Sequence, residues 1–174
     1  DDAGRVVAVE GVIRDVTEQV AFVGALAHEA RHDPLTDLAN RRAVEQRIDL
    51  ELLAADRWGA PTGLVVVVID LVRFGEVNEL FGHDVGDQLL KAVADRLRTL
   101  GPPVVEVGRL AGDAYAVVAC PAGLDEADDL VERVRATVRP PSTVDGRVHY
   151  VDVTVGVRSL TVHSSELGPT GAGP

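Results

Sequence analysis

Two acidic residues, 43 positions apart, stand where carboxylates could hold a divalent cation. Asp70 ends the apolar run at residues 65–69, and that run predicts a buried strand. Asp113 lies within residues 109–115, between two β-type stretches, and this arrangement predicts the tip of a hairpin. Carboxylates that are fixed on rigid strands and exposed at the strand ends are suited to hold Mg²⁺ against a nucleotide triphosphate. An acid that ends a strand is common, however, so Asp70 alone predicts little.

The sequence around these acids predicts alternating helices and strands. Apolar residues at spacings of three and four predict a helix over about residues 41–57, and Asn40 is placed to cap its N-terminus. The order that follows is β-α-α-β-β-α-β with a hairpin in its middle, which predicts an α+β domain, a ferredoxin-like palm with a mixed central sheet flanked by helices. The predicted elements are a strand at 63–70, helical segments at 74–81 and 84–100, strands at 104–110 and 114–120, a helix at 125–138 and a strand at 148–160.

Composition limits the class of protein. The chain has 174 residues, of which 46% are hydrophobic, enough for one globular domain with a core. Its longest apolar run, residues 64–69, is far shorter than the roughly 20 residues of a membrane-spanning helix. A net charge of −11 with scattered basic residues makes nucleic acid an unlikely partner. The single cysteine, Cys120, and the lack of a signal segment predict a cytoplasmic location, and a chain without Met that begins Asp1-Asp2 is expected to be an excerpt of a longer protein.

The segment from Asp70 to Asp87 and the loop Ala-Gly-Asp-Ala-Tyr at 111–115 together resemble the GGDEF family of diguanylate cyclases. The resemblance covers about residues 33–160 and implies a nucleotide-cyclase palm that takes GTP as substrate. It implies that Mg²⁺ is bound by Asp70, by the carbonyl of Leu71 and by Asp113, the last also being the catalytic acid.

The same resemblance assigns residues to the substrate. Asn78 and Asp87 would hydrogen-bond the edge of guanine, Phe74 would lie under the nucleotide-binding loop, and Gly112 would allow close approach to the phosphates. A carboxylate at 87 accepts from both the N1–H and the exocyclic amine of guanine, which adenine cannot offer together. The alternative is that Asp87 only caps a helix that begins at residue 88.

Several positions depart from the family pattern. Ala111 stands in place of the first Gly of the loop and Ala114 in place of its Glu, and Tyr115 replaces Phe. The loss of the Glu removes a carboxylate from a site that holds cations against phosphates, which typically costs about 10² to 10⁴ in rate. Val72 replaces a second Asp and Gly75 a phosphate-neutralising Lys. The inhibitory Arg-x-x-Asp motif, expected at 102–105, reads Pro-Pro-Val-Val.

The resemblance also divides the chain. Residues 1–16 look like the C-terminal remnant of a PAS sensor domain, and 17–32 like a signalling helix and linker, begun by Thr17 or Asp15 as N-cap. Its apolar stripe at 17–31 suits a homodimeric coiled coil. The GGDEF-like domain is expected at 33–162 without the family's usual C-terminal helix, and 163–174 as a disordered tail. Within the domain, Asp33 and Arg41 are expected to pin its first turn.

Three functions remain open at this point. The first is a degenerate, inactive GGDEF module in cyclic-di-GMP signalling, which binds GTP and regulates a sensor or phosphodiesterase domain of a longer parent protein. The second is an active diguanylate cyclase that condenses two GTP into cyclic di-GMP. The third is a truncated interaction module without a binding role.

Overall fold

The computed structural model describes residues 15–58 and 63–161. Three predictions lie outside these residues: the sensor-type strand before Asp15, the tail at 163–174 and the absence of a helix after the last strand. The chain divides into two compact units, Asp1–Ala30 and Arg31–Pro174.

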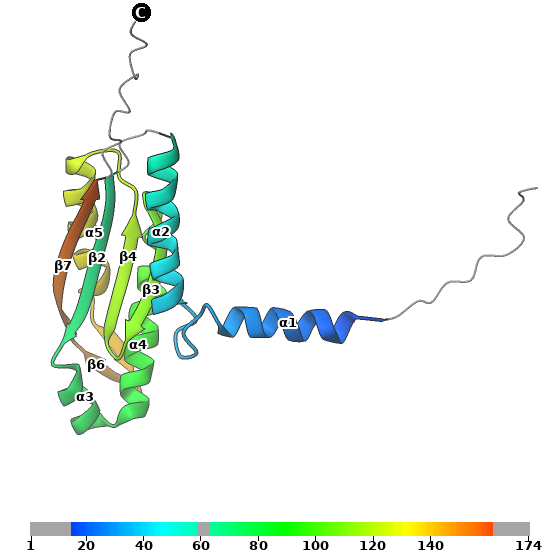
Figure 1. Ribbon diagram of the computed structural model, residues 1–174. Helices are drawn as coiled ribbons and strands as arrows, with labels where there is room; N and C mark the ends of the chain where they lie inside the picture. The colour runs from blue at the N-terminus through cyan, green and yellow to red at the C-terminus, as the bar shows by residue number, and fades with distance from the viewer. Residues whose placement is uncertain (1–14, 59–62, 162–174) are drawn as a thin grey trace, which may run out of the picture. The chain divides into compact units, whose positions relative to one another are not determined.

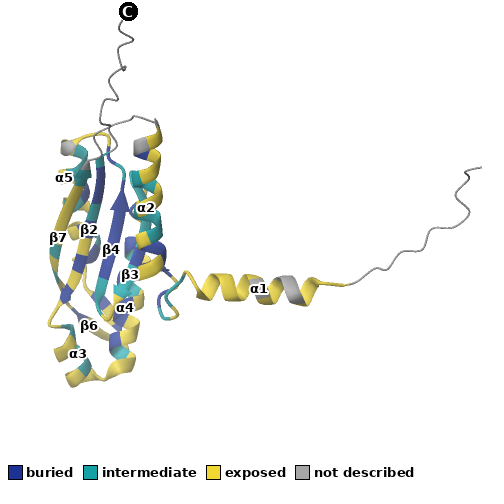
Figure 2. Cartoon of the chain, viewed as in Figure 1, coloured by how far each residue is buried: buried dark blue, intermediate teal, exposed yellow. Residues whose placement is uncertain are grey.

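The first unit contains one described element, helix α1 (Thr17–Glu29). The N-cap residue of α1 is Val16, so the prediction of Thr17 or Asp15 as N-cap is wrong, although the Asp15 carboxylate accepts a hydrogen bond from the Thr17 N–H at 2.9 Å. The side chains of α1 that the structure describes are exposed, among them Phe22 and Leu26 (Figure 2).

The second unit contains the predicted domain. None of the described helices is both long enough and apolar enough to cross a bilayer. The elements in chain order are β1 (Ala39–Asn40), α2 (Arg41–Trp58), β2 (Gly63–Val72), α3 (Phe74–Phe81), α4 (His83–Leu97), β3 (Val104–Ala111), β4 (Ala114–Ala119), α5 (Leu124–Val138), β5 (Ser142–Val144), β6 (Arg147–His149) and β7 (Asp152–Thr161).

Five strands form one sheet in the order β1-β3-β4-β2-β7 (Figure 1). β1 runs parallel to β3, and the other neighbouring strands are antiparallel, so the sheet is mixed. β2 has neighbours on both sides, which suits its run of β-branched residues. The predicted α+β class with a mixed central sheet flanked by helices is confirmed, and the predicted order appears as β2-α3-α4-β3-β4-α5-β7.

Helices cover both faces of this sheet. On one face, alternate residues of β2 such as Val67 and Ile69 pack with α4 and α5, and these residues are fully buried. On the other face, α2 packs through Ala43 and Val44 onto β4 and the neighbouring strands. Figure 2 shows β4 buried between the two layers. The end of β2 and the tip of the β3–β4 hairpin meet at the same end of the sheet, because Asp70 pairs with the first residue of β4.

The strand predicted at 148–160 is wrong in its first part. Residues Arg147–His149 form β6, which pairs with β5 in a separate hairpin, and β7 begins only at Asp152. The turn between β5 and β6 is Asp145-Gly146, with φ of 49° and 73°. An Asp-Gly pair between apolar residues is a strong hairpin signal, and the regular alternation of valines hid it. The two-residue strand β1 was also not predicted.

The other boundaries moved by a few residues. Asn40 accepts a hydrogen bond from the Ala43 N–H at 3.0 Å, which confirms it as the cap of α2. α4 begins at His83 and ends at Leu97, where the sequence had predicted 84–100. Asp87 is therefore the fifth residue of α4, so the alternative that it only caps a helix is wrong.

Gly108 marks the closest approach of β3 to β1 and α2, and we expect its substitution to be costly. A Cβ there would lie 2.2 Å from Val44 Cγ2 and 2.7 Å from the Ala39 carbonyl oxygen. Gly108→Ala should lower the free energy of unfolding by about 2–3 kcal/mol, because a backbone atom must move. Gly156→Ala in β7 is the matched control, since nothing lies within 4 Å of its Cβ. Urea denaturation measures both, and equal effects would contradict this account.

Candidate functional site

The two predicted metal-binding segments meet across neighbouring strands. Asp70 on β2 is paired with Ala114, the first residue of β4, and Asp113 precedes Ala114 at the hairpin tip. Asp70 is exposed and Asp113 is half-buried. Directly opposed residues have Cβ atoms about 4.5–5.5 Å apart. A Glu at 114 would therefore place a second carboxylate opposite Asp70. Ala114 places only a methyl group there.

The hairpin tip turns at a single glycine. Gly112 has φ of 54°, whereas Ala111 ends β3 as a paired strand residue. Ala111 is not among the described residues with positive φ, so the methyl group at 111 does not strain the backbone. The Gly112 carbonyl accepts hydrogen bonds from Arg109 Nε at 2.9 Å and from Arg109 Nη2 at 2.6 Å.

The same arginine ties the hairpin to the first turn of the domain. Arg109 Nη1 lies 3.0 Å from Asp33 Oδ1, and both side chains are mostly buried. Asp33 also accepts hydrogen bonds from the Thr36 N–H at 2.9 Å and the Thr36 hydroxyl at 2.7 Å. Partial burial by itself raises the pKa of Asp33, but the hydrogen bonds from Thr36 and Arg109 together outweigh it and hold that pKa below its ordinary value.

Arg41 does not take part in this turn. It begins α2, its side chain is 59% exposed, and its charged partner is Glu45 at 3.9 Å. The prediction that Asp33 and Arg41 together pin the first turn is therefore wrong for Arg41. A partner 76 positions from Asp33 cannot be chosen from sequence spacing.

Tyr115 connects the hairpin to the core. The residue is fully buried, and its hydroxyl donates a hydrogen bond to the Leu90 carbonyl of α4 at 2.9 Å. Burial raises the pKa of this phenol, so it stays protonated and acts as a donor. The hydroxyl that replaces the hydrogen of Phe thus finds a partner, and the change at 115 is compatible with the fold.

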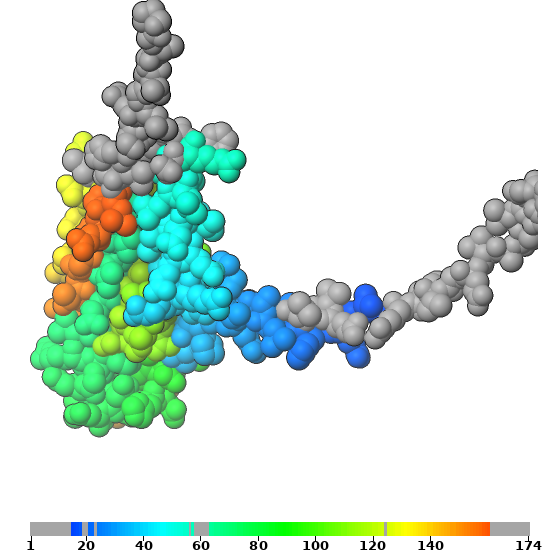
Figure 3. Space-filling view, viewed as in Figure 1, coloured from blue at the N-terminus to red at the C-terminus, as the bar shows by residue number. Residues whose placement is uncertain are grey.

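The predicted guanine-binding residues lie on two helices that touch at a glycine. A Cβ on Gly86 of α4 would be 2.0 Å from Asn78 Oδ1 and 3.1 Å from Phe74 Cζ, both of α3. Asn78 therefore lies directly against α4 beside Asp87, which is exposed. Phe74 packs against the main core, and the Phe81 ring at the other end of α3 meets the His149 ring edge-on at 5.0 Å. Figure 3 shows α3 and α4 at the surface of one end of the domain.

A short turn joins the two halves of the site. β2 ends at Val72, and Arg73 follows with φ of 58° before α3 begins. The Leu71 side chain is buried, so only its carbonyl could bind a ligand. Val72 stands where the family pattern has a second Asp, and it is paired with Asp152 of β7. Since Asp70 is paired with Thr154, the Asp152 carboxylate lies diagonally across from Asp70.

The largest cavity described near these residues does not unite them. It has a volume of about 540 Å³ and lies between α3 and the start of β7, lined by Arg73, Leu80, Arg139, Tyr150 and other residues. None of Asp70, Asn78, Asp87 and Asp113 is among its lining residues. This cavity is therefore separate from the candidate metal-binding and guanine-binding residues.

The comparison with protein families decides the assignment of the fold. The diguanylate cyclase GGDEF domain matches residues 30–168. The chain belongs to the GGDEF family. The family match includes the loop at 111–115.

Curated relatives of this GGDEF domain are longer proteins. It is 37% identical over 133 residues to the cyclic di-GMP phosphodiesterase NbdA of Pseudomonas aeruginosa, covering 76% of this chain and 17% of that protein. It is 34% identical over 145 residues to the diguanylate cyclase TpbB of the same species, covering 80% of this chain and 32% of TpbB. The chain thus spans less than a third of the length of either relative.

Solved structures share the fold. The GGDEF domain of TpbB from P. aeruginosa superposes with a TM-score of 0.66 at 32% identity, covering 72% of this chain and 73% of that one. Diguanylate cyclase SiaD of P. aeruginosa, solved in complex with its activator SiaC, gives 0.70 at 29% identity, covering 83% and 55%. The coiled coil and GGDEF domain of DgcB from Caulobacter crescentus gives 0.74 at 24% identity, covering 83% and 77%, which shows the fold alone.

The sequence analysis assigned no role to three residues that the structure places at this site: Arg109, Asp152 and Gly86. Gly86 is in fact inside α4, with no positive φ. The spacing Asn78 to Gly86 could have suggested a close helix pair, but no sequence signal pairs Arg109 with Asp33.

We expect Asp33→Asn to destabilise the GGDEF domain near neutral pH by about 2 kcal/mol, because the charge that Arg109 faces is removed from a mostly buried place. The folded-state pKa of Asp33 is depressed, so its contribution is fully present above the unfolded value of about 3.9 and is lost as pH falls through the folded value. The difference between the variant and the parent should therefore shrink in acid. Unfolding curves between pH 7 and pH 2 measure this, with the exposed Asp128→Asn as control.

We expect Gly86→Ala to separate α3 from α4. Alanine gains up to about 1 kcal/mol over glycine inside a helix, but the overlap with Asn78 and Phe74 should outweigh it and leave a net loss of about 1–2 kcal/mol. Gly75→Ala in α3 is the matched control, since nothing lies within 4 Å of its Cβ and it should stabilise the domain. Thermal unfolding measures whether each variant is more or less stable than the parent domain. A stabilised Gly86→Ala variant would contradict the close contact.

Proposed function

We propose that this GGDEF domain binds GTP with Mg²⁺, does not make cyclic di-GMP, and regulates a domain attached to it in a longer protein. The observation that carries the proposal is the pairing of Asp70 with Ala114. Where family members place two carboxylates across neighbouring strands, this chain has one carboxylate and a methyl group. The remaining acids can attract a cation, but the group lost from position 114 is one that family resemblance gives to catalysis.

The donors that remain fit Mg²⁺. Asp70, the Leu71 carbonyl and Asp113 offer oxygen atoms only, which is the chemistry that Mg²⁺ prefers. A bound Mg²⁺ would neutralise phosphate charge at the strand ends. Gly75 leaves this neutralisation without a Lys, and its Cβ position is open, so packing does not explain the missing cation. We infer that nucleotide binding is weaker here than in a site that has all the acidic and basic residues of the family pattern.

Recognition of the base is assigned to α3 and α4. Asn78 is held against Gly86, and Asp87 follows on the exposed side of α4. This arrangement presents an amide and a carboxylate together, and a carboxylate that accepts two donors distinguishes guanine from adenine. The position of Asp87 inside a helix, away from the cap, supports this role.

The regulatory part of the proposal rests on α1 and on length. α1 exposes Phe22 at 65% and Leu26 at 49%, one turn apart, which suits a coiled-coil homodimer. A helix of 13 residues is marginal by itself, so a stable dimer would need further contacts. Both curated relatives named above are more than twice as long as this chain, which supports a parent protein with a sensor or a phosphodiesterase domain.

Calorimetric titration of the purified chain with GTP and Mg²⁺, with ATP as the comparison, tests the proposal. We expect a roughly micromolar Kd for GTP, weaker binding of ATP, and no cyclic di-GMP by chromatography after incubation. Asp87→Ala should weaken GTP binding about tenfold and remove the preference over ATP, because guanine loses its acceptor. Asp84→Ala, an exposed acid one turn earlier on α4, is the matched control.

Each alternative has its own outcome. Cyclic di-GMP made by the unmodified chain would show an active cyclase and overturn the weight placed on Ala114. The absence of any GTP binding would leave an interaction module. Ala114→Glu should strengthen Mg²⁺-dependent GTP binding, since it restores a carboxylate opposite Asp70.

A further inference from the structure

The outer edge of β3 is only partly covered. β1 pairs with β3 at Gly108 and Arg109, and among the described strands none pairs with the outer side of Val104–Val107. Asp37, with φ of 56°, turns the chain just before β1, so β1 does not continue along this edge. A strand edge without a partner presents N–H and C=O groups that can pair with another extended chain.

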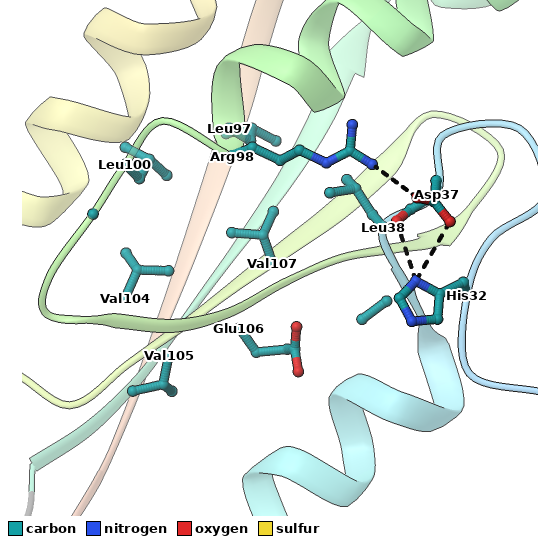
Figure 4. A pocket seen from close by; sticks show the side chains of 12 residues that line it. His32, Asp37, Leu38, Leu97, Arg98, Leu100, Val104, Val105, Glu106 and Val107 are labelled. Atoms are coloured by element: carbon teal, nitrogen blue, oxygen red, sulfur yellow. Dashed lines mark hydrogen bonds and ion pairs between the residues drawn. The ribbon is translucent and has the colours of Figure 1, made fainter. Parts of the chain in front are cut away.

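A cavity of about 340 Å³ lies along this uncovered edge (Figure 4). A register shift between Val104 and Glu106 marks a β-bulge. Val104 and Val107 pack with the core on the side of Leu97 and Leu100, and Figure 4 shows Val105 and Glu106 on the opposite side of the strand. The cavity therefore borders both sides of the sheet at one edge.

The two sides of the edge differ in chemistry. One side is apolar, with Leu97 and Leu100 buried in the wall. On the other side Glu106 is half-buried, and no hydrogen bond or ion pair of its carboxylate is found among the described residues, although its backbone belongs to the β3–β4 ladder. The acids and bases nearest to it in the cavity wall are His32, Asp37 and Arg98, which bond to one another and to Thr36. The Glu106 carboxylate thus has no positively charged partner among the described residues.

We infer that this edge binds an extended peptide in which apolar and basic residues alternate, added to the sheet beside β3. Side chains of a strand alternate between the two faces. A peptide along Val104–Val107 would set its apolar residues against Leu97 and Leu100 and its basic residues against Glu106. Main-chain hydrogen bonds supply affinity in such strand addition, and the alternate side chains supply specificity.

Charge argues against a second copy of this chain as the occupant. Two β3 edges related by a two-fold axis would bring Glu106 near its own counterpart, and like charges opposite each other are destabilising. The net charge of −11 also attracts a basic peptide to the chain.

A labelled peptide of sequence Lys-Val-Lys-Val-Lys-Val tests the inference with the full chain. Fluorescence anisotropy should show binding, and Glu106→Lys should weaken it at least about tenfold while allowing the counterpart Glu-Val-Glu-Val-Glu-Val to bind. Glu132→Lys is the matched control, because Glu132 is 80% exposed on α5 and the change in net charge is the same. Hydrogen exchange of residues 104–107 should slow when the peptide is present.

N-methylation separates strand addition from simple charge attraction. In an extended peptide the N–H groups of alternate residues face the same edge. Only one set of amides, that of the valines or that of the lysines, faces β3. Methylating that set should abolish binding, whereas methylating the other set should change the affinity by no more than a few-fold. Equal effects of the two sets, equal effects of Glu106→Lys and Glu132→Lys, or a chain dimer that the peptide dissociates would each overturn the inference.

Discussion

The rest of the site depends on the Arg109 guanidinium, which donates hydrogen bonds both to the Asp33 carboxylate and to the Gly112 carbonyl. The hairpin tip has no side chain of its own to bury at Gly112, and its turn points toward solvent. One guanidinium donates to the tip and to an acid whose other hydrogen bonds hold the first turn of the domain. The turn that follows α1 and the loop that carries Asp113 are therefore parts of one hydrogen-bonded unit.

This connection gives the domain a physical route between its N-terminal turn and the site that we propose to bind nucleotide. The route continues through Tyr115, whose buried hydroxyl reaches the Leu90 carbonyl of α4, the helix that carries Gly86 and Asp87. Every step is a directed hydrogen bond or a close contact in a packed core, and packed cores transmit small displacements. A domain with a weakened catalytic loop can keep this route, because none of its contacts uses position 114. The proposed loss of catalysis is thus compatible with the proposed regulatory role.

Much of the fold could be predicted because its signals are local. The apolar run before Asp70, the helical spacing of α2 with Asn40 as its cap and the hairpin around Gly112 each depend on neighbours within a few residues. The prediction of the strand at 148–160 failed because the alternation of valines continues across the gap between two separate strands. The valine alternation ran through Tyr150 without marking the end of β6, and β1 is too short to have any pattern. At the site, the acids were found from their types and positions, but their partners were not.

Residue types at fixed spacings were enough to predict the family, the main helices and strands of the sheet, the candidate acids and the lack of a carboxylate at 114. The three-dimensional contacts were needed to show that position 114 lies opposite Asp70, that Arg109 and not Arg41 pairs with Asp33, and that Asn78 packs against Gly86. They were also needed to show that no described strand pairs with the outer edge of β3 beside Glu106. Each of these is a contact between segments far apart in the chain. Such contacts depend on which distant strands and helices lie side by side, and local residue spacing does not specify that pairing.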